Sequence, residues 1–97
     1  MAPTPTTHVK FIEKEQIKFL QFPKEDVLYQ MKDKVNRIVS LRRALALGNL
    51  EREKVKIIFV DNEGFKKVET TIWGFTDKEV ILKQGTIIPV ARVYNVV

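Results

Sequence analysis

The chain has 97 residues, of which 44% are hydrophobic and 30% are charged, and its net charge at pH 7 is +5. This length allows one domain with a modest core, and the basic excess favours anionic partners. The absence of cysteine excludes disulfides and thiol chemistry and agrees with a cytoplasmic location, while no apolar run approaches the roughly 20 residues of a membrane span, so we expect no membrane partner.

Residues 1–23 are expected to form a flexible N-terminal arm that precedes one domain, residues 24–97. The first seven residues lack the basic region and apolar stretch of a secretory signal and predict a disordered lead-in. The segment that follows is ambiguous. Val9 and Phe11 alternate as in a strand, whereas the spacing of Phe11 and Phe19 also fits two helical turns. A short strand and a helical turn both remain open.

A helix is predicted from about residue 24 to residue 47. Pro23 suits the first helical position because its missing N–H has no partner there in any case, and Asp26 then places negative charge in the first turn. Gly48 tolerates the left-handed conformation that ends many helices. Ser40 can cap a separate short helix, so a break near this residue is also open.

The predicted helix has an apolar stripe and a basic surface beside it. The stripe has helical spacing, is interrupted by Arg42 and must be covered by the sheet or by another subunit. It consists of Leu28, Met31, Val35, Ile38 and Leu45. Asp33 is the only acidic residue between positions 32 and 43. The basic residues there are Lys32, Lys34, Arg37, Arg42 and Arg43.

Residues 54–97 predict a small five-stranded antiparallel sheet, bent or closed into a barrel, which makes the fold class α+β. Gly64 and Gly85 mark turns. Gly74 interrupts a long strand and marks a bulge or a sharp bend. Pro89 cannot donate to a strand neighbour and indicates a turn or one-turn helix before the last strand. The expected strands are 55–60, 65–75, 79–83, a short strand between Gly85 and Pro89, and 93–97.

This order of elements resembles the Sm-like and Src-homology-3-like small β-barrels. The resemblance rests on Val55 to Val60, on Trp73-Gly74-Phe75-Thr76-Asp77 followed by Val80 to Lys83, and on Ile88 to Val93. It implies a barrel behind an N-terminal helix. The loop Gly85 to Pro89 is largely apolar and departs from RNA-binding Sm rings, whose loop is polar and basic. The stretch Val68 to Trp73, together with Leu82 to Gly85 and Ile88-Pro89, also resembles a group of uncharacterised small bacterial proteins.

Enzyme chemistry is not expected. His8 is the only histidine, and it lies in the predicted arm, where no catalytic base is held in place. Without cysteines and with a single histidine, metal-ligand spacing is missing. Asp61 and Glu63 are typical of a plain turn. We therefore expect no catalytic residue, no metal and no cofactor.

Two non-enzymatic functions remain. The leading hypothesis is a module that contacts RNA or a nucleoprotein assembly through its basic helix and the barrel rim. Its candidate residues are Lys32, Lys34, Arg37, Arg42, Arg43, Lys66 and Lys67, although a basic helix face is often merely solvated. The alternative is a protein–protein adaptor or homo-oligomer that docks through the arm and through Leu28, Met31, Val35 and Ile38.

Five further residues, all in the predicted sheet region, have expected roles. Trp73, with Phe75 or Tyr94, can provide a surface for base stacking, although core packing is the commoner role of aromatics in so small a domain. Lys83 can extend the basic rim. Arg92 is expected to anchor the closing turn by bonding to a carboxylate such as Glu69.

Overall fold

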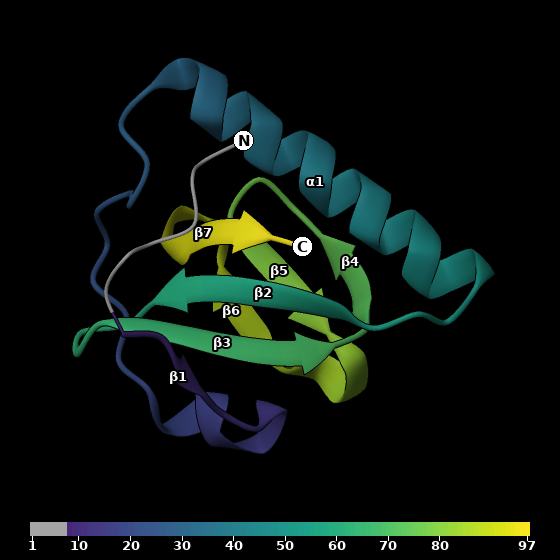
Figure 1. Ribbon diagram of the computed structural model, residues 1–97, viewed down its shortest axis with the longest axis horizontal. Coiled ribbons are helices and arrows are strands. Elements are labelled where there is room, and N and C mark those ends of the chain that lie inside the picture. Colours follow the sequence, from purple (N-terminus) through teal and green to yellow (C-terminus); the bar gives the residue numbers. More distant parts are fainter. Residues whose placement is uncertain (1–7) are drawn as a thin grey trace.

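The computed structural model describes residues 8–97 and has an α+β fold with one long helix, α1 (Met31–Leu50), and two β-sheets (Figure 1). Residues 1–7 of the predicted arm lie outside the described residues. The strands are β1 (Lys10–Phe11), β2 (Val55–Val60), β3 (Phe65–Thr70), β4 (Ile72–Phe75), β5 (Glu79–Leu82), β6 (Ile87–Pro89) and β7 (Val93–Val96). The short 3₁₀ helices are η1 (Lys14–Phe19), η2 (Lys83–Gly85) and η3 (Val90–Arg92).

The first sheet has the strand order β1-β3-β2-β7 and the second has the order β4-β5-β6. Only β1 and β3 pair in parallel; the other described pairs are antiparallel. The hairpin between β2 and β3 is closed by Asp61, whose Oδ1 accepts the backbone N–H groups of Glu63 and Gly64 at 2.8 and 3.0 Å. Gly64 has φ +142°. The turns predicted here and at Gly85 are confirmed, as is the one-turn helix after Pro89.

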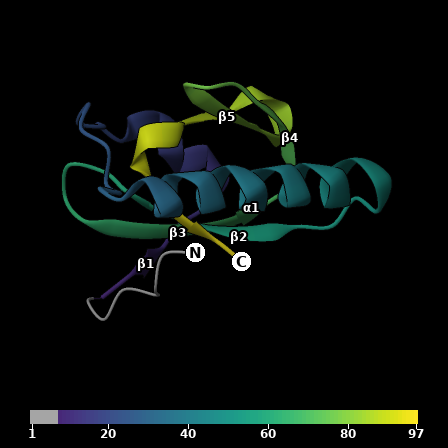
Figure 2. The same cartoon turned by 90° about the horizontal axis from the view of Figure 1, so that it is seen from above.

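The closed-barrel alternative is wrong, because the two sheets share no strand pair. The long strand predicted over residues 65–75 is divided at Thr71 into β3 and β4, which belong to different sheets. Its predicted irregularity is confirmed, since the β4–β5 register shifts between Ile72 and Gly74. The helix contacts β4 and β7, one end strand of each sheet. It lies over the space between the sheets (Figure 2).

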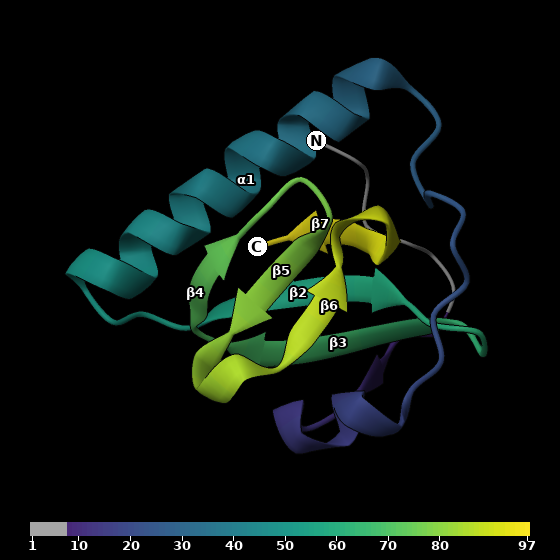
Figure 3. The same ribbon diagram turned by 180° about the vertical axis from the view of Figure 1, so that it is seen from behind.

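The helix begins at Met31, seven residues later than predicted. The preceding segment is held in a non-helical path by partners distant in sequence. Val27 N–H donates to Ala91 O at 2.9 Å, and Arg92 Nη1 donates to Glu25 O at 2.7 Å. This segment passes beside the turn before β7 (Figure 3). The local helix signals do not produce a helix in this segment, because tertiary hydrogen bonds satisfy backbone groups that a helix would otherwise pair.

The predicted end of the helix at Gly48 is also wrong, as is the optional break at Ser40, because α1 continues to Leu50. The left-handed residue is Arg52, with φ +56°. Gly48 instead allows a close approach, since a Cβ at this position would lie 2.9 Å from Ile72 O and 2.9 Å from Thr71 Cγ2. Its role is therefore to let α1 lie directly against the junction of β3 and β4.

The core lies between the two sheets and α1, and the N-terminal segment contributes to it. Ile12 follows β1 and Ile17 lies in η1; they are 6% and 2% exposed, so the short strand and the helical turn left open by the sequence both form. Among residues 8–97, no helix combines the length and apolar character that a membrane span requires. The most deeply buried side chains are Phe59, Ile17, Leu41, Ile57, Ile72, Leu82, Ile88, Val68, Val80 and Val93.

Candidate nucleic-acid interface

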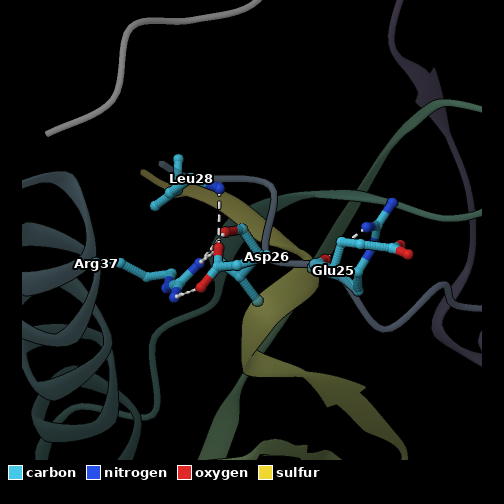
Figure 4. A network of polar contacts seen from close by, with 6 residues as sticks. Glu25, Asp26, Leu28 and Arg37 are labelled. Carbon is cyan, nitrogen blue, oxygen red and sulfur yellow. Dashed lines mark hydrogen bonds and ion pairs between the residues drawn. The ribbon is translucent and has the colours of Figure 1, made fainter. Parts of the chain in front are cut away.

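Arg37, the central cation of the predicted basic face, points inward. Its Nη1 donates to Asp26 Oδ1 at 2.9 Å and its Nη2 donates to Asp26 Oδ2 at 2.8 Å (Figure 4). Nη1 also donates to Val93 O at 3.1 Å. Arg37 is 7% exposed, so the structure does not support its predicted contact with phosphates. Burial raises the pKa of Asp26, but hydrogen bonds from Arg37 and Leu28 N–H, with the charge of Arg37, outweigh this and lower it.

Lys66 is a second predicted contact residue with a structural role. It is 6% exposed, and its Nζ lies 3.0 Å from Asp61 Oδ2 and 3.6 Å from Glu63 Oε1. Burial raises the pKa of Asp61, but hydrogen bonds from Glu63 N–H, Lys66 and Gly64 N–H outweigh it and lower the pKa. The pair Lys66–Asp61 therefore stabilises the β2–β3 hairpin.

The other predicted cations remain accessible. Lys67 is half-buried, and its Nζ lies 5.5 Å from the centre of the Phe11 ring, a cation–π arrangement. Lys34 is half-buried on α1. Exposed cations on α1 are Lys32, Arg42 and Arg43. Lys67 lies at the start of β3, whereas these three lie on the helix, so the predicted cations do not form one cluster.

Arg92 anchors the closing turn as expected but with different partners. Its Nε donates to Val60 O at 2.9 Å, and its Nη1 donates to Glu25 O. The expected bond to a carboxylate such as Glu69 is wrong; Glu69 is exposed.

The side chain of Trp73 is open to solvent in a hollow. It is 53% exposed, so the alternative of core packing is wrong for this residue. Phe75 packs against the core, and Tyr94 contacts Phe65 edge to face, with ring centres 5.2 Å apart. Neither Phe75 nor Tyr94 therefore offers a second open ring beside Trp73. The hollow has a volume of about 360 Å³, toward the lower end of the roughly 300–1,000 Å³ found for small-ligand pockets. It is lined by Gly48, Asn49, Arg52, Thr71, Trp73 and Lys83, and we call it the Trp73 hollow.

Three elements meet at the Trp73 hollow because α1 approaches the β3–β4 junction without a side chain at Gly48. The end of α1 brings Asn49, and the left-handed turn after it brings Arg52. Lys83 comes from the 3₁₀ turn that follows β5. Two cations and one amide therefore surround an exposed indole ring.

The Trp73 hollow has a neighbour whose lining carries charges of both signs. A second polar hollow shares Thr71 and Lys83 with it. Its lining adds three carboxylates, from Glu13, Glu15 and Glu69, and two cations, from Lys14 and Lys54. With Lys83 the positive and negative side chains of this lining are equal in number, so this side has no net charge that would attract an extended polyanion bound at Trp73. The opposite direction leads along α1, where Arg42 lies two helical turns before Asn49 and on the same side of the helix.

Sequence reasoning named Trp73 and Lys83 but missed Asn49 and Arg52. These two residues occupy the helix end and the link after it, and no spacing relates them to an aromatic residue more than 20 positions later. Among residues 8–97, no group of three or more histidine, cysteine, aspartate or glutamate side chains is placed to hold a metal ion. Comparison with known proteins gave no similarity: no family model, no curated protein and no solved structure matches this chain.

Proposed function

We propose that this protein is a non-enzymatic module that binds single-stranded RNA at the Trp73 hollow, alone or within a nucleoprotein assembly. The observation that carries the proposal is the 53% exposure of Trp73 between Arg52 and Lys83. Proteins that bind single strands combine aromatic side chains, on which bases stack, with cations that track the phosphates. The half-exposed Trp73 is accessible to a base, and stacking would remove apolar surface of its side chain from water.

Charge supports a direction for the bound strand. With one base stacked on Trp73, Arg52 and Lys83 can contact the flanking phosphates. The lining of the adjacent hollow has balanced charge, whereas the exposed Arg42 favours a path along α1. The amide of Asn49 can donate to and accept from a base edge. We therefore propose that the phosphates contact Arg52 and Lys83. These two residues replace Arg37 and Lys66, which the sequence predicted for this role.

We also propose that the protein is related to the Sm-like proteins and acts in the cytoplasm. A helix that precedes the β-region, a strand bent between two sheets and a one-turn helix before the last strand support the resemblance. The proposal does not include the RNA contact that Sm rings make through the loop before the last strand, because the segment after Gly85 is apolar in this chain.

The proposal is tested with the intrinsic fluorescence of Trp73, the only tryptophan of the chain. Titration with a mixed-sequence 12-nucleotide single-stranded RNA at low salt should quench this emission, because the indole stacks on a base. The same RNA with a fluorescent label provides affinities by anisotropy. We expect Trp73→Ala to weaken binding roughly 5- to 140-fold, since stacking contributes about 1–3 kcal/mol per base.

Matched variants separate a site from general charge attraction. Arg52→Glu and Lys83→Glu should weaken binding and reduce its salt dependence. Lys78→Glu makes the same charge change at an exposed residue that does not line the hollow and should have a smaller effect. Equal losses for Lys78→Glu and Lys83→Glu, or no quenching of Trp73 at low salt, would refute the proposal. A duplex RNA and a single-stranded DNA of the same sequence define the preferred nucleic acid.

A further inference from the structure

The solvent side of α1 carries a line of largely apolar side chains that residues 8–97 leave exposed. Met31, Val35, Val39 and Leu50 are 72%, 52%, 48% and 84% exposed. The steps between successive members are four, four, three, four and four residues, which keeps them on one side of the helix. This outer ridge consists of Met31, Val35, Val39, Arg42, Ala46 and Leu50, all exposed.

The outer ridge differs from the apolar stripe that the sequence predicts. The buried face of α1 consists instead of Arg37, Leu41, Ala44 and Gly48. Of the residues predicted to bind a partner, Leu28 is buried before the helix begins and Ile38 is half-buried. Met31 and Val35 remain available. A solvent-facing helix surface is ordinarily polar, and an exposed line that is apolar except for Arg42 marks an interaction site.

The charges on α1 indicate which kind of partner fits the outer ridge. Asp33 is the only acidic residue in Met31–Leu50, and it is half-buried. Arg42 lies within the ridge, and Lys32 and Arg43 are exposed close to it. We propose that the outer ridge docks an acidic amphipathic helix of a partner protein, whose apolar stripe covers the ridge and whose carboxylates pair with these cations.

Other occupants agree less well with the same residues. If two copies paired antiparallel about the middle of the ridge, each Arg42 would lie opposite Val39 of the other copy and less than one helical turn from the other Arg42, and this like-charge proximity opposes a homodimer. An anionic lipid surface favours large apolar residues such as tryptophan, phenylalanine and leucine, whereas the middle of the ridge carries valine, arginine and alanine. The ridge has no aromatic ring on which an RNA base could stack.

The test uses three labelled 20-residue peptides, whose length matches α1 at roughly 30 Å. The first has leucines along one helix face flanked by glutamates. The second has the same composition in scrambled order, and the third replaces the glutamates with lysines. Fluorescence anisotropy should show binding of the first peptide alone. Binding should weaken as salt rises, because the charged contacts are screened.

Protein variants then locate the contact. Val35→Asp and Arg42→Glu should each weaken peptide binding about tenfold or more, as expected for central interface residues. The matched control is Phe19→Asp, which adds the same charge at an apolar residue that is 77% exposed on η1. It should bind the peptide normally. Trp73→Ala should also bind it normally, which separates this surface from the RNA site.

Specific outcomes overturn the inference. These are equal binding of the scrambled peptide, unchanged binding by Val35→Asp, and no binding of the acidic peptide at low salt. Dimerisation of the wild-type protein that Val35→Asp abolishes, measured by sedimentation equilibrium, would assign the ridge to a second copy. Binding to vesicles of phosphatidylcholine and phosphatidylglycerol that Val35→Asp abolishes would assign it to lipid.

Discussion

Arg37 and Asp26 form a two-pronged ion pair that joins α1 to the loop preceding it. The same guanidinium donates to Val93 O and so ties both segments to the start of β7. Three parts of the chain thus depend on one buried cation. Arg37 Nε has no hydrogen-bond partner among the described residues, so the arginine is retained in spite of an unpaired donor.

Asp26→Asn should destabilise the protein by about 2–4 kcal/mol, because it leaves the charge of Arg37 buried without its counter-ion. Urea unfolding monitored by circular dichroism measures this change. The double variant Asp26→Leu with Arg37→Met removes both charges and should recover much of the loss. A single variant as stable as the wild type would show that the pair is not needed for stability.

Stability should decrease in acid. The pKa values of Asp26 and Asp61 lie below the ordinary value near 3.9, because hydrogen bonds and neighbouring cations outweigh the effect of burial. A carboxyl group whose pKa is lower in the folded protein than in the unfolded chain stabilises the fold at higher pH. This contribution is lost as the pH falls below about 4.

The check is the free energy of unfolding by urea at pH 7, 5 and 3. We expect little change between pH 7 and 5 from these two groups and a clear decrease between pH 5 and 3. Asp26→Asn should show a smaller decrease over the lower interval. An identical acid profile for wild type and variant would contradict the role of Asp26.

Gly48→Ala should destabilise the protein despite alanine's higher helix propensity. The new Cβ would approach Ile72 O and Thr71 Cγ2 to 2.9 Å. Overpacking of this kind costs about 1–3 kcal/mol, and the propensity gain offsets about 1 kcal/mol at most. The emission of Trp73 should also shift, since α1 moves away from β4. Asn49→Ala, at an exposed neighbouring position, is the control and should leave stability nearly unchanged.

Ile17→Ala should cost about 2–5 kcal/mol, because Ile17 is 2% exposed and belongs to the core. Phe19→Ala, on the same short helix but at a 77% exposed residue, should change stability by less than about 0.5 kcal/mol. Thermal and urea unfolding of the two variants compare them directly. Equal stabilities would mean that the segment before α1 acts as a dispensable arm.

The β-region was predictable because its signals are local. Alternating apolar residues mark each strand, and the positive φ angles of Gly64 and Gly85 are conformations that glycine adopts without strain. The division at Thr71 was foreseen only as a bend. Whether a bent strand closes a barrel or enters a second sheet depends on contacts between residues far apart in the chain, which alternation does not encode.

The binding residues were less predictable, and Arg37 shows why. Helical spacing places it off the centre of the apolar stripe, where a cation is ordinarily solvated. In the structure Arg37 lies on the face of α1 that points inward. The free-energy cost of burying its charge is offset because Asp26 lies opposite it. Conversely, Trp73 is of a residue type that is usually largely buried, but it remains exposed beside Gly48.

Local patterns were enough to predict the α+β class, the helix before the main strands, and most turns, because periodicity and glycine act over a few residues. Contacts between distant residues set which face of α1 is buried, which cations remain free and where an aromatic ring stays open. Apolar residues lie on several sides of α1, so burial alone does not select a face. The choice follows from long-range packing and from the pairing of buried charges.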